Sequence, residues 1–172
     1  MLLSFVSLTF AQDRDEAQFG TVHFSTSCND IAQRRFDRAM RYQHSFWYRQ
    51  SKEIFEETLK ADPTCALAYW GIALSLLWNP HAAPPAANMP LGLAALEKGK
   101  TIGAKTARER DYIDALMALY ADYQNVPRGR RVQAYLRDQG VPDVHVARDP
   151  QPPEPDPTSG KFRRVWTEPA VS

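Results

Sequence analysis

The N-terminal third of this sequence carries side chains that could bind a metal ion. His23 and His44 lie on either side of Cys28, and imidazole and thiolate groups are ligands that transition metals and haem iron accept. Their spacing sets no recognised ligand pattern. Alternatively, each histidine has a structural role and forms a hydrogen bond near a turn. An exported metal- or haem-binding protein that uses His23 and His44 is therefore an alternative function, whereas the main expectation is a protein without a cofactor.

The sequence contains two cysteines, Cys28 and Cys65. In an oxidising compartment they could form a disulfide across the first pair of predicted helices. In a reducing compartment they would pack as small apolar side chains. Both states stay open at this point. A disulfide would require α-carbons about 4.4–6.8 Å apart.

Motifs of common enzyme classes are missing from the sequence. It has no glycine-rich phosphate loop and no Gly-x-Ser-x-Gly element. No pair of carboxylates stands on an apolar helix face. We therefore expect that the protein is not an enzyme.

Aromatic residues offer a different kind of site. Trp47 and Tyr48 follow one another at a predicted turn, where aromatic rings would give a partner a large contact area at low entropic cost. They are the candidate partner-binding residues, and Trp70 is expected in the core. The basic run at Arg128, Arg130 and Arg131 is interpreted as a solvated turn.

Length and charge limit the classes of protein to consider. A chain of 172 residues is expected to form one domain around one core. Its 21 basic and 20 acidic side chains nearly balance, so we expect no nucleic-acid partner. The apolar residues 1–11 are too short to span a bilayer as a helix, and stable membrane insertion is not expected.

Residues 1–11 nevertheless resemble a signal peptide. Thr9 and Ala11 place small residues where a signal peptidase cuts, although no basic residue precedes Arg14. The prediction is export to the periplasm or the cell exterior if this segment is a signal peptide, and a cytoplasmic protein otherwise.

Apolar residues recur at helical spacing through the middle of the chain. Residues 12–29 are predicted to be irregular, and 30–138 to form a helical domain. Thr106 and Glu109 form a capping box, which marks a helix start, and Pro63 marks a helix end. The predicted helices span 31–45, 48–61, 66–78, 90–102, 106–123 and 130–138.

The C-terminal segment 139–172 has a different composition. Six prolines occur from Pro142 to Pro157, and they forbid a continuous helix there. Large apolar residues are few and scattered, so the segment cannot bury enough surface to offset the entropy lost on ordering. We predict a disordered, proline-rich tail.

The helices from residue 32 to 76 fit the 34-residue period of a tetratricopeptide repeat. Such a repeat needs small, aromatic and proline residues at fixed positions. In the first unit these are Ala39, Tyr42, Phe55 and Pro63, and in the second they are Tyr69, Ile72, Ala73 and Leu76. The period predicts antiparallel helical hairpins that stack as an α-solenoid fragment.

Several longer motifs extend this likeness from Gly20 to about Leu136. They include GTVHF at 20–24, HSFWY at 44–48, ADPTCA at 61–66, AYWGIA at 68–73 and GAKT at 103–106. With these motifs the chain resembles a family of bacterial tetratricopeptide-repeat proteins that are mostly uncharacterised and usually exported. The resemblance implies an all-helical scaffold and no catalytic residues.

The likeness ends near Arg137, where relatives continue with further helices. We interpret this as a truncation or a change of reading frame, with a natural short member as the alternative. The final helix would then lack its stacking neighbour and promote self-association. The sequence thus predicts an all-α, non-enzymatic repeat scaffold whose partner is an unknown protein or peptide.

Overall fold

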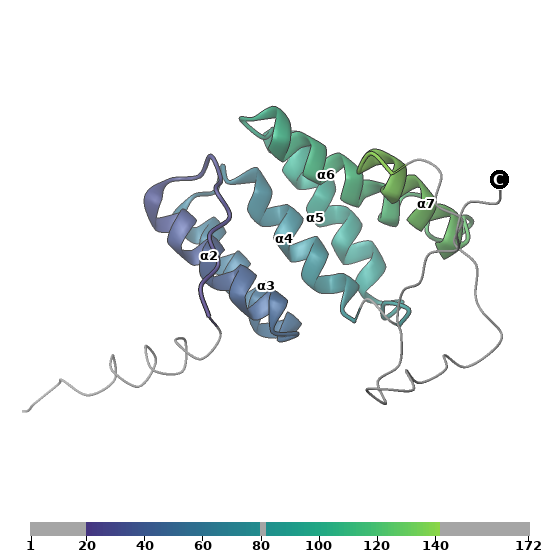
Figure 1. Ribbon diagram of the computed structural model, residues 1–172, viewed down its shortest axis with the longest axis horizontal. Helices are drawn as coiled ribbons and strands as arrows, with labels where there is room; N and C mark the ends of the chain where they lie inside the picture. The colour runs from purple at the N-terminus through teal and green to yellow at the C-terminus, as the bar shows by residue number, and fades with distance from the viewer. Residues whose placement is uncertain (1–19, 80–81, 142–172) are drawn as a thin grey trace, which may run out of the picture.

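The computed structural model describes residues 20–79 and 82–141, and within these ranges the protein is entirely helical, with no β-strand (Figure 1). This confirms the predicted all-α class. The helices are α2 (Asp30–His44), α3 (Tyr48–Ala61), α4 (Ala66–Leu77), α5 (Asn88–Ile102), α6 (Ala107–Tyr120) and α7 (Arg128–Asp138).

Local signals account for most of these boundaries. Asn29 caps α2 by accepting a hydrogen bond from the Ala32 amide, and the predicted capping box of Thr106 and Glu109 begins α6. Pro63 follows the end of α3. The connection between α4 and α5 is long, as expected from the prolines at 80–85.

The predicted helices agree with the structure to within three residues at each end, and the predicted start at Tyr48 is correct. One expectation is wrong. The basic run at Arg128 is not a turn, since α7 begins there and continues through Arg131. The prediction for this last helix was therefore two residues short at its N-terminus.

Consecutive helices pack as antiparallel hairpins. In addition, α4 contacts both α2 and α6, so these three helices form one layer across the molecule (Figure 1). Helix α4 lies in the middle, and its apolar residues point to neighbours on several sides, as its uniform composition indicates. The C-terminal ends of α2, α4 and α6 consequently lie at the same end of the layer.

Small residues allow the helices to approach closely. Ala39 of α2 and Ala73 of α4 are fully buried, and an added Cβ at Gly71 would stand 2.4 Å from the ring of Phe55. Ile31 and Leu91 also follow the apolar spacing of their helices, but they are mostly exposed. Their helices present other faces to the core because helix packing, and not the apolar stripe alone, sets the rotation.

Two predictions concern residues outside the described ranges. They are the candidate signal peptide at 1–11 and nearly all of the predicted tail at 139–172. Among the helices that the structure describes, none has the length and apolar character needed to cross a membrane.

Candidate functional site

Residues 20–28, here called the strap, run along the layer formed by α2, α4 and α6. The ring of Phe24 contacts one aromatic residue from each helix: its centroid lies 5.6 Å from that of Phe36, 5.9 Å from that of Trp70 and 5.3 Å from that of Tyr112. All three partners lie in the N-terminal halves of their helices. The strap therefore covers one half of the layer.

Polar contacts fix the first part of the strap to α2. The Asp37 carboxylate accepts a hydrogen bond from the Phe24 amide at 2.9 Å and lies 2.8 Å from Nδ1 of His23. Gln33 accepts from both the amide and the hydroxyl of Thr26 at 2.7 Å. His23 thus has a structural partner, which corresponds to the hydrogen-bonding interpretation of this residue.

Glu109 of α6 holds the second part of the strap. Its buried carboxylate accepts hydrogen bonds from the Ser27 amide at 2.6 Å and the Ser27 hydroxyl at 2.7 Å, while it also completes the cap of α6 with Thr106. Burial opposes ionisation of Glu109, but these hydrogen bonds outweigh it and hold the pKa of the carboxyl below its ordinary value.

A covalent link ends the strap. Cys28 and Cys65 form a disulfide with their α-carbons 5.0 Å apart. Next to it, the Asp62 carboxylate accepts hydrogen bonds from the amides of Asn29 and Thr64 at 2.9 and 3.0 Å. Burial raises the pKa of Asp62, whereas these bonds, the Thr64 hydroxyl and the charge of Lys105 bring it below the ordinary value.

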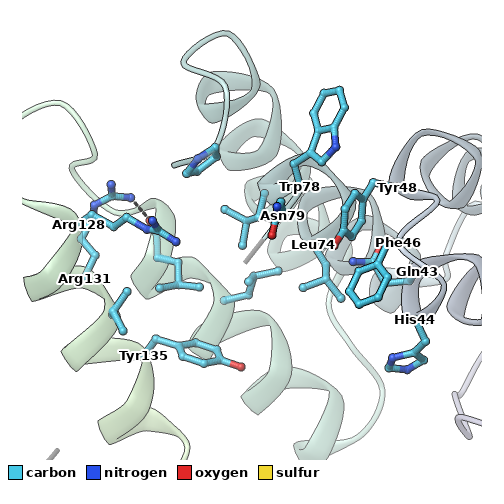
Figure 2. A pocket seen from close by; sticks show the side chains of 15 residues that line it. Gln43, His44, Phe46, Tyr48, Leu74, Trp78, Asn79, Arg128, Arg131 and Tyr135 are labelled. Carbon is cyan, nitrogen blue, oxygen red and sulfur yellow. Dashed lines mark hydrogen bonds between the residues drawn. The ribbon is translucent and has the colours of Figure 1, made fainter. Parts of the chain in front are cut away.

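The other half of the layer is open and contains a cavity of about 460 Å³. Its floor consists of leucines from the C-terminal halves of α4 and α6, and its two walls are the turn after α2 and the first turns of α7 (Figure 2). The lining residues are Gln43, His44, Phe46, Tyr48, Leu74, Leu77, Trp78, Asn79, Pro84, Leu116, Leu119, Arg128, Arg131, Val132 and Tyr135.

The rim of this cavity has unusual backbone conformations. Phe46 and Trp78, which line it, follow the ends of α2 and α4 and have positive φ angles of 66° and 62°. Bulky residues rarely adopt this region, which glycine favours. Phe46 and Trp78 are also 70% and 52% exposed. The chain therefore keeps two large aromatic residues at the rim at a cost in backbone strain.

The structure separates the predicted partner-binding pair. Tyr48 is buried and lines the cavity. Trp47 is half-exposed, packs edge-on against Tyr42 with centroids 6.4 Å apart, and is not one of the residues that line the described cavity. The exposed aromatic residues that line the cavity are Phe46 and Trp78.

The candidate metal ligands are not brought together. His23 lies on the strap beside Asp37, and the Cys28 sulfur is bonded to Cys65. His44 lies at the C-terminal end of α2, in the cavity wall. Within residues 20–79 and 82–141, no three His, Cys, Asp or Glu side chains converge on a point that could hold a metal ion.

Sequence reasoning missed the arginines of α7. Arg128 and Arg131 line the cavity and were assigned to a solvated turn. The signal that could have located them is the helical spacing of Val132, Tyr135 and Leu136 directly after them, which predicts a face that packs on α6.

Comparison of the chain with protein-family models, with curated proteins and with solved structures gives no match.

Proposed function

We propose that this protein is a non-enzymatic helical-repeat scaffold that binds a segment of a protein partner in the cavity between the α2–α3 turn and α7. The observation that carries the proposal is the cavity itself. Its volume of about 460 Å³ lies within the range of about 300–1,000 Å³ that is usual for ligand pockets. It is floored by leucines and rimmed by the exposed rings of Phe46 and Trp78.

The strap supports a peptide as the occupant. Residues 20–28 are held on the same helical layer by the Phe24 side chain, by hydrogen bonds to backbone groups and by the Cys28–Cys65 disulfide. The first two kinds of contact are also available to a bound peptide. The layer of α2, α4 and α6 thus binds an extended segment in its covered half. The same three helices form the open half, where a partner peptide would bind.

The arrangement of helices also agrees with the tetratricopeptide-like interpretation. The small positions Ala39 and Ala73 are buried where helices cross, and α4 contacts the first helix of the hairpin on either side. In repeat scaffolds the layer of first helices forms the extended binding surface. The repeat assignment and the binding role remain one proposal, supported by the same geometry.

The two carboxyl groups with lowered pKa values favour a structural role over catalysis. Asp62 and Glu109 both have their pKa values lowered by hydrogen bonds to the backbone next to or within the strap. Their oxygens are occupied by these donors and lie away from the cavity. We therefore propose no reaction for this protein.

A binding experiment with rim variants tests the proposal. A library of random peptides of about twelve residues is passed over the immobilised full-length protein, and the retained peptides are identified by mass spectrometry and titrated by fluorescence anisotropy. Phe46→Ala and Trp78→Ala should weaken their binding about tenfold or more, because large aromatic side chains that a partner covers contribute strongly to such interfaces.

Matched controls are available on other surfaces. Ile31 and Leu91 are 53% and 57% exposed and do not line the described cavity. Ile31→Ala and Leu91→Ala should leave the affinities unchanged. If no peptide is retained, or if the control variants weaken binding as much as the rim variants, the proposed function is wrong.

A further inference from the structure

Resting on the proposed function, we infer that the cavity binds the proline-rich segment 150–157 of the same chain, and that a partner peptide must displace this segment. The segment has the sequence PQPPEPDP, with five prolines in eight residues. Three features support this occupant: the aromatic lining of the cavity, the spacing of the prolines, and the short connection between the segment and α7.

Aromatic side chains give the cavity the lining that proline recognition needs. They are Phe46, Tyr48, Trp78 and Tyr135. Phe46 and Tyr48 belong to one wall, where their ring centroids lie 6.2 Å apart and their planes are inclined at 73°. Figure 2 shows Tyr135 on α7, pointing from the opposite side toward this wall. Proline-rich segments bind in grooves lined by aromatic rings, because flat ring faces offer a large contact area at low entropic cost.

The spacing of the prolines suits such a groove. Pro150 and Pro153 are three positions apart, and so are Pro152 and Pro155. A polyproline II helix has three residues per turn, so residues three positions apart lie on the same face. Proline also fixes its φ angle before binding. A proline-rich segment therefore loses less conformational entropy in the cavity than another apolar sequence would.

Hydrogen-bond donors in the lining match the backbone of this segment. Proline has no N–H, and polyproline II leaves its carbonyl groups without internal hydrogen bonds. The ligand is thus rich in acceptors and poor in donors. The Tyr135 hydroxyl and the Trp78 indole N–H can donate to such carbonyls. Burial and the neighbouring Tyr112 raise the pKa of Tyr135, so its hydroxyl stays a donor at neutral and mildly basic pH.

The position of the segment in the chain allows it to reach the cavity. The described part of the chain ends at Val141, six positions after Tyr135 of the lining. Residues 142–149 then precede Pro150, and eight extended residues span about 26 Å. Helix α7 has 11 residues and is about 17 Å long. The connection is therefore long enough for the segment to return along α7 to the cavity.

Attachment to the same chain favours this segment over a free ligand. A short tether gives an effective concentration in the millimolar range, so even weak binding keeps the cavity filled. The cavity also supplies apolar surface that the segment lacks on its own, because its floor is made of Leu74, Leu77, Leu116 and Leu119. A partner peptide consequently has to compete with the segment, which sets the threshold for binding.

A labelled peptide with the sequence of residues 148–159, here called the probe, measures access to the cavity. Its affinity is determined by fluorescence anisotropy for the full-length wild type and for a full-length five-alanine variant. The five substitutions are Pro150→Ala, Pro152→Ala, Pro153→Ala, Pro155→Ala and Pro157→Ala. The variant should bind the probe at least about tenfold more tightly, which corresponds to a wild-type cavity about 90% occupied by its own segment. A probe with alanine at the same five positions keeps every charge and should not bind.

Matched variants locate the effect on both sides of the contact. Pro142→Ala and Pro169→Ala lie outside the segment and should leave the affinity for the probe at its wild-type value. Added to the five-alanine variant, Phe46→Ala and Trp78→Ala should each weaken probe binding at least about tenfold. Leu91→Ala, outside the described cavity lining, should not. Circular dichroism of each variant checks the fold.

The possible results separate this inference from the proposed function. Equal affinity of the wild type and the five-alanine variant for the probe would overturn the inference. Failure of the probe to bind either protein would also overturn it, and would leave the proposed function intact if random peptides still bind in a way that depends on Trp78. Absence of any rim-dependent peptide binding overturns both. Wild-type dimers that dissociate in the five-alanine variant would place the segment in the cavity of a second copy, and would overturn a contact within one chain.

Discussion

Gly92 of α5 lies directly against the ring of Tyr120 of α6, and a Cβ added at Gly92 would stand 2.3 Å from three atoms of that side chain. Tyr120 is fully buried, and its hydroxyl donates a hydrogen bond of 2.6 Å to the Ala73 carbonyl of α4. The pair therefore joins three helices, and the absence of a side chain at Gly92 is what permits the contact.

Replacing Gly92 with alanine should destabilise the protein. Alanine is favoured over glycine within a helix by about 1 kcal/mol, but the clash with a buried ring would cost about 1–3 kcal/mol or more. The clash should win, so we expect a lower melting temperature for Gly92→Ala by circular dichroism. Gly129→Ala is the matched control: no described atom lies within 4 Å of its added Cβ, and it should raise the melting temperature slightly.

Acid should loosen the strap through Glu109. The pKa of its carboxyl is lowered in the folded state, whereas an unfolded glutamate has a pKa of about 4.3. The unfolded chain therefore takes up the proton first as the pH falls. This contribution to the free energy of unfolding is complete above about pH 4.3 and is lost as the pH falls through the lower folded-state pKa.

Glu109→Gln should remove this part of the pH dependence. The variant should melt at a lower temperature than the wild type at pH 7, and the gap should narrow towards pH 3. Part of the acid sensitivity should persist in the variant, because the pKa of Asp62 is lowered as well. A gap that stays constant from pH 7 to pH 3 would contradict the assigned role of the Glu109 charge.

Reduction of the disulfide should lower stability. Cys28 and Cys65 are separated by 37 positions, and closing a loop of this length reduces the entropy of the unfolded chain by an amount worth about 3–4 kcal/mol. We expect a lower denaturation midpoint in urea when dithiothreitol is present. The double variant Cys28→Ser with Cys65→Ser should resemble the reduced protein, and its midpoint should not respond to dithiothreitol.

Phe46→Gly should separate stability from binding. Phe46 has a φ of 66°, which glycine adopts without steric cost, and relief of such strain is worth about 1–3 kcal/mol. Glycine also makes the unfolded chain more flexible, which costs about 0.4–1 kcal/mol. We expect an unchanged or higher melting temperature together with weaker peptide binding. A clear loss of stability would show that the exposed ring is a structural element.

Much of the helical architecture could be predicted from the sequence because its signals are local. The capping box at Thr106, the proline after Asp62 and the apolar spacing within each helix involve residues only a few positions apart. The predicted range 48–61 coincides with α3. The first two residues of α7 lay outside the predicted helix; the arginines of its first turn are unfavourable at a helix N-terminus, so the local signal there opposed the helix that forms.

The candidate site depended on contacts that local patterns do not encode. Ser27 and Glu109 are 82 residues apart, and the cavity draws its lining from α2, α4, α6 and α7 as well as the connections between them. Local sequence patterns located the helices to within a few residues and identified Ala39 and Ala73 as positions of the repeat pattern. The packing of the helices places the strap over one half of the layer and Arg128 and Arg131 beside the other half. The rotation and stacking of whole helices determine which residues from distant parts of the sequence come together. This rotation and stacking follow from packing summed over the entire core.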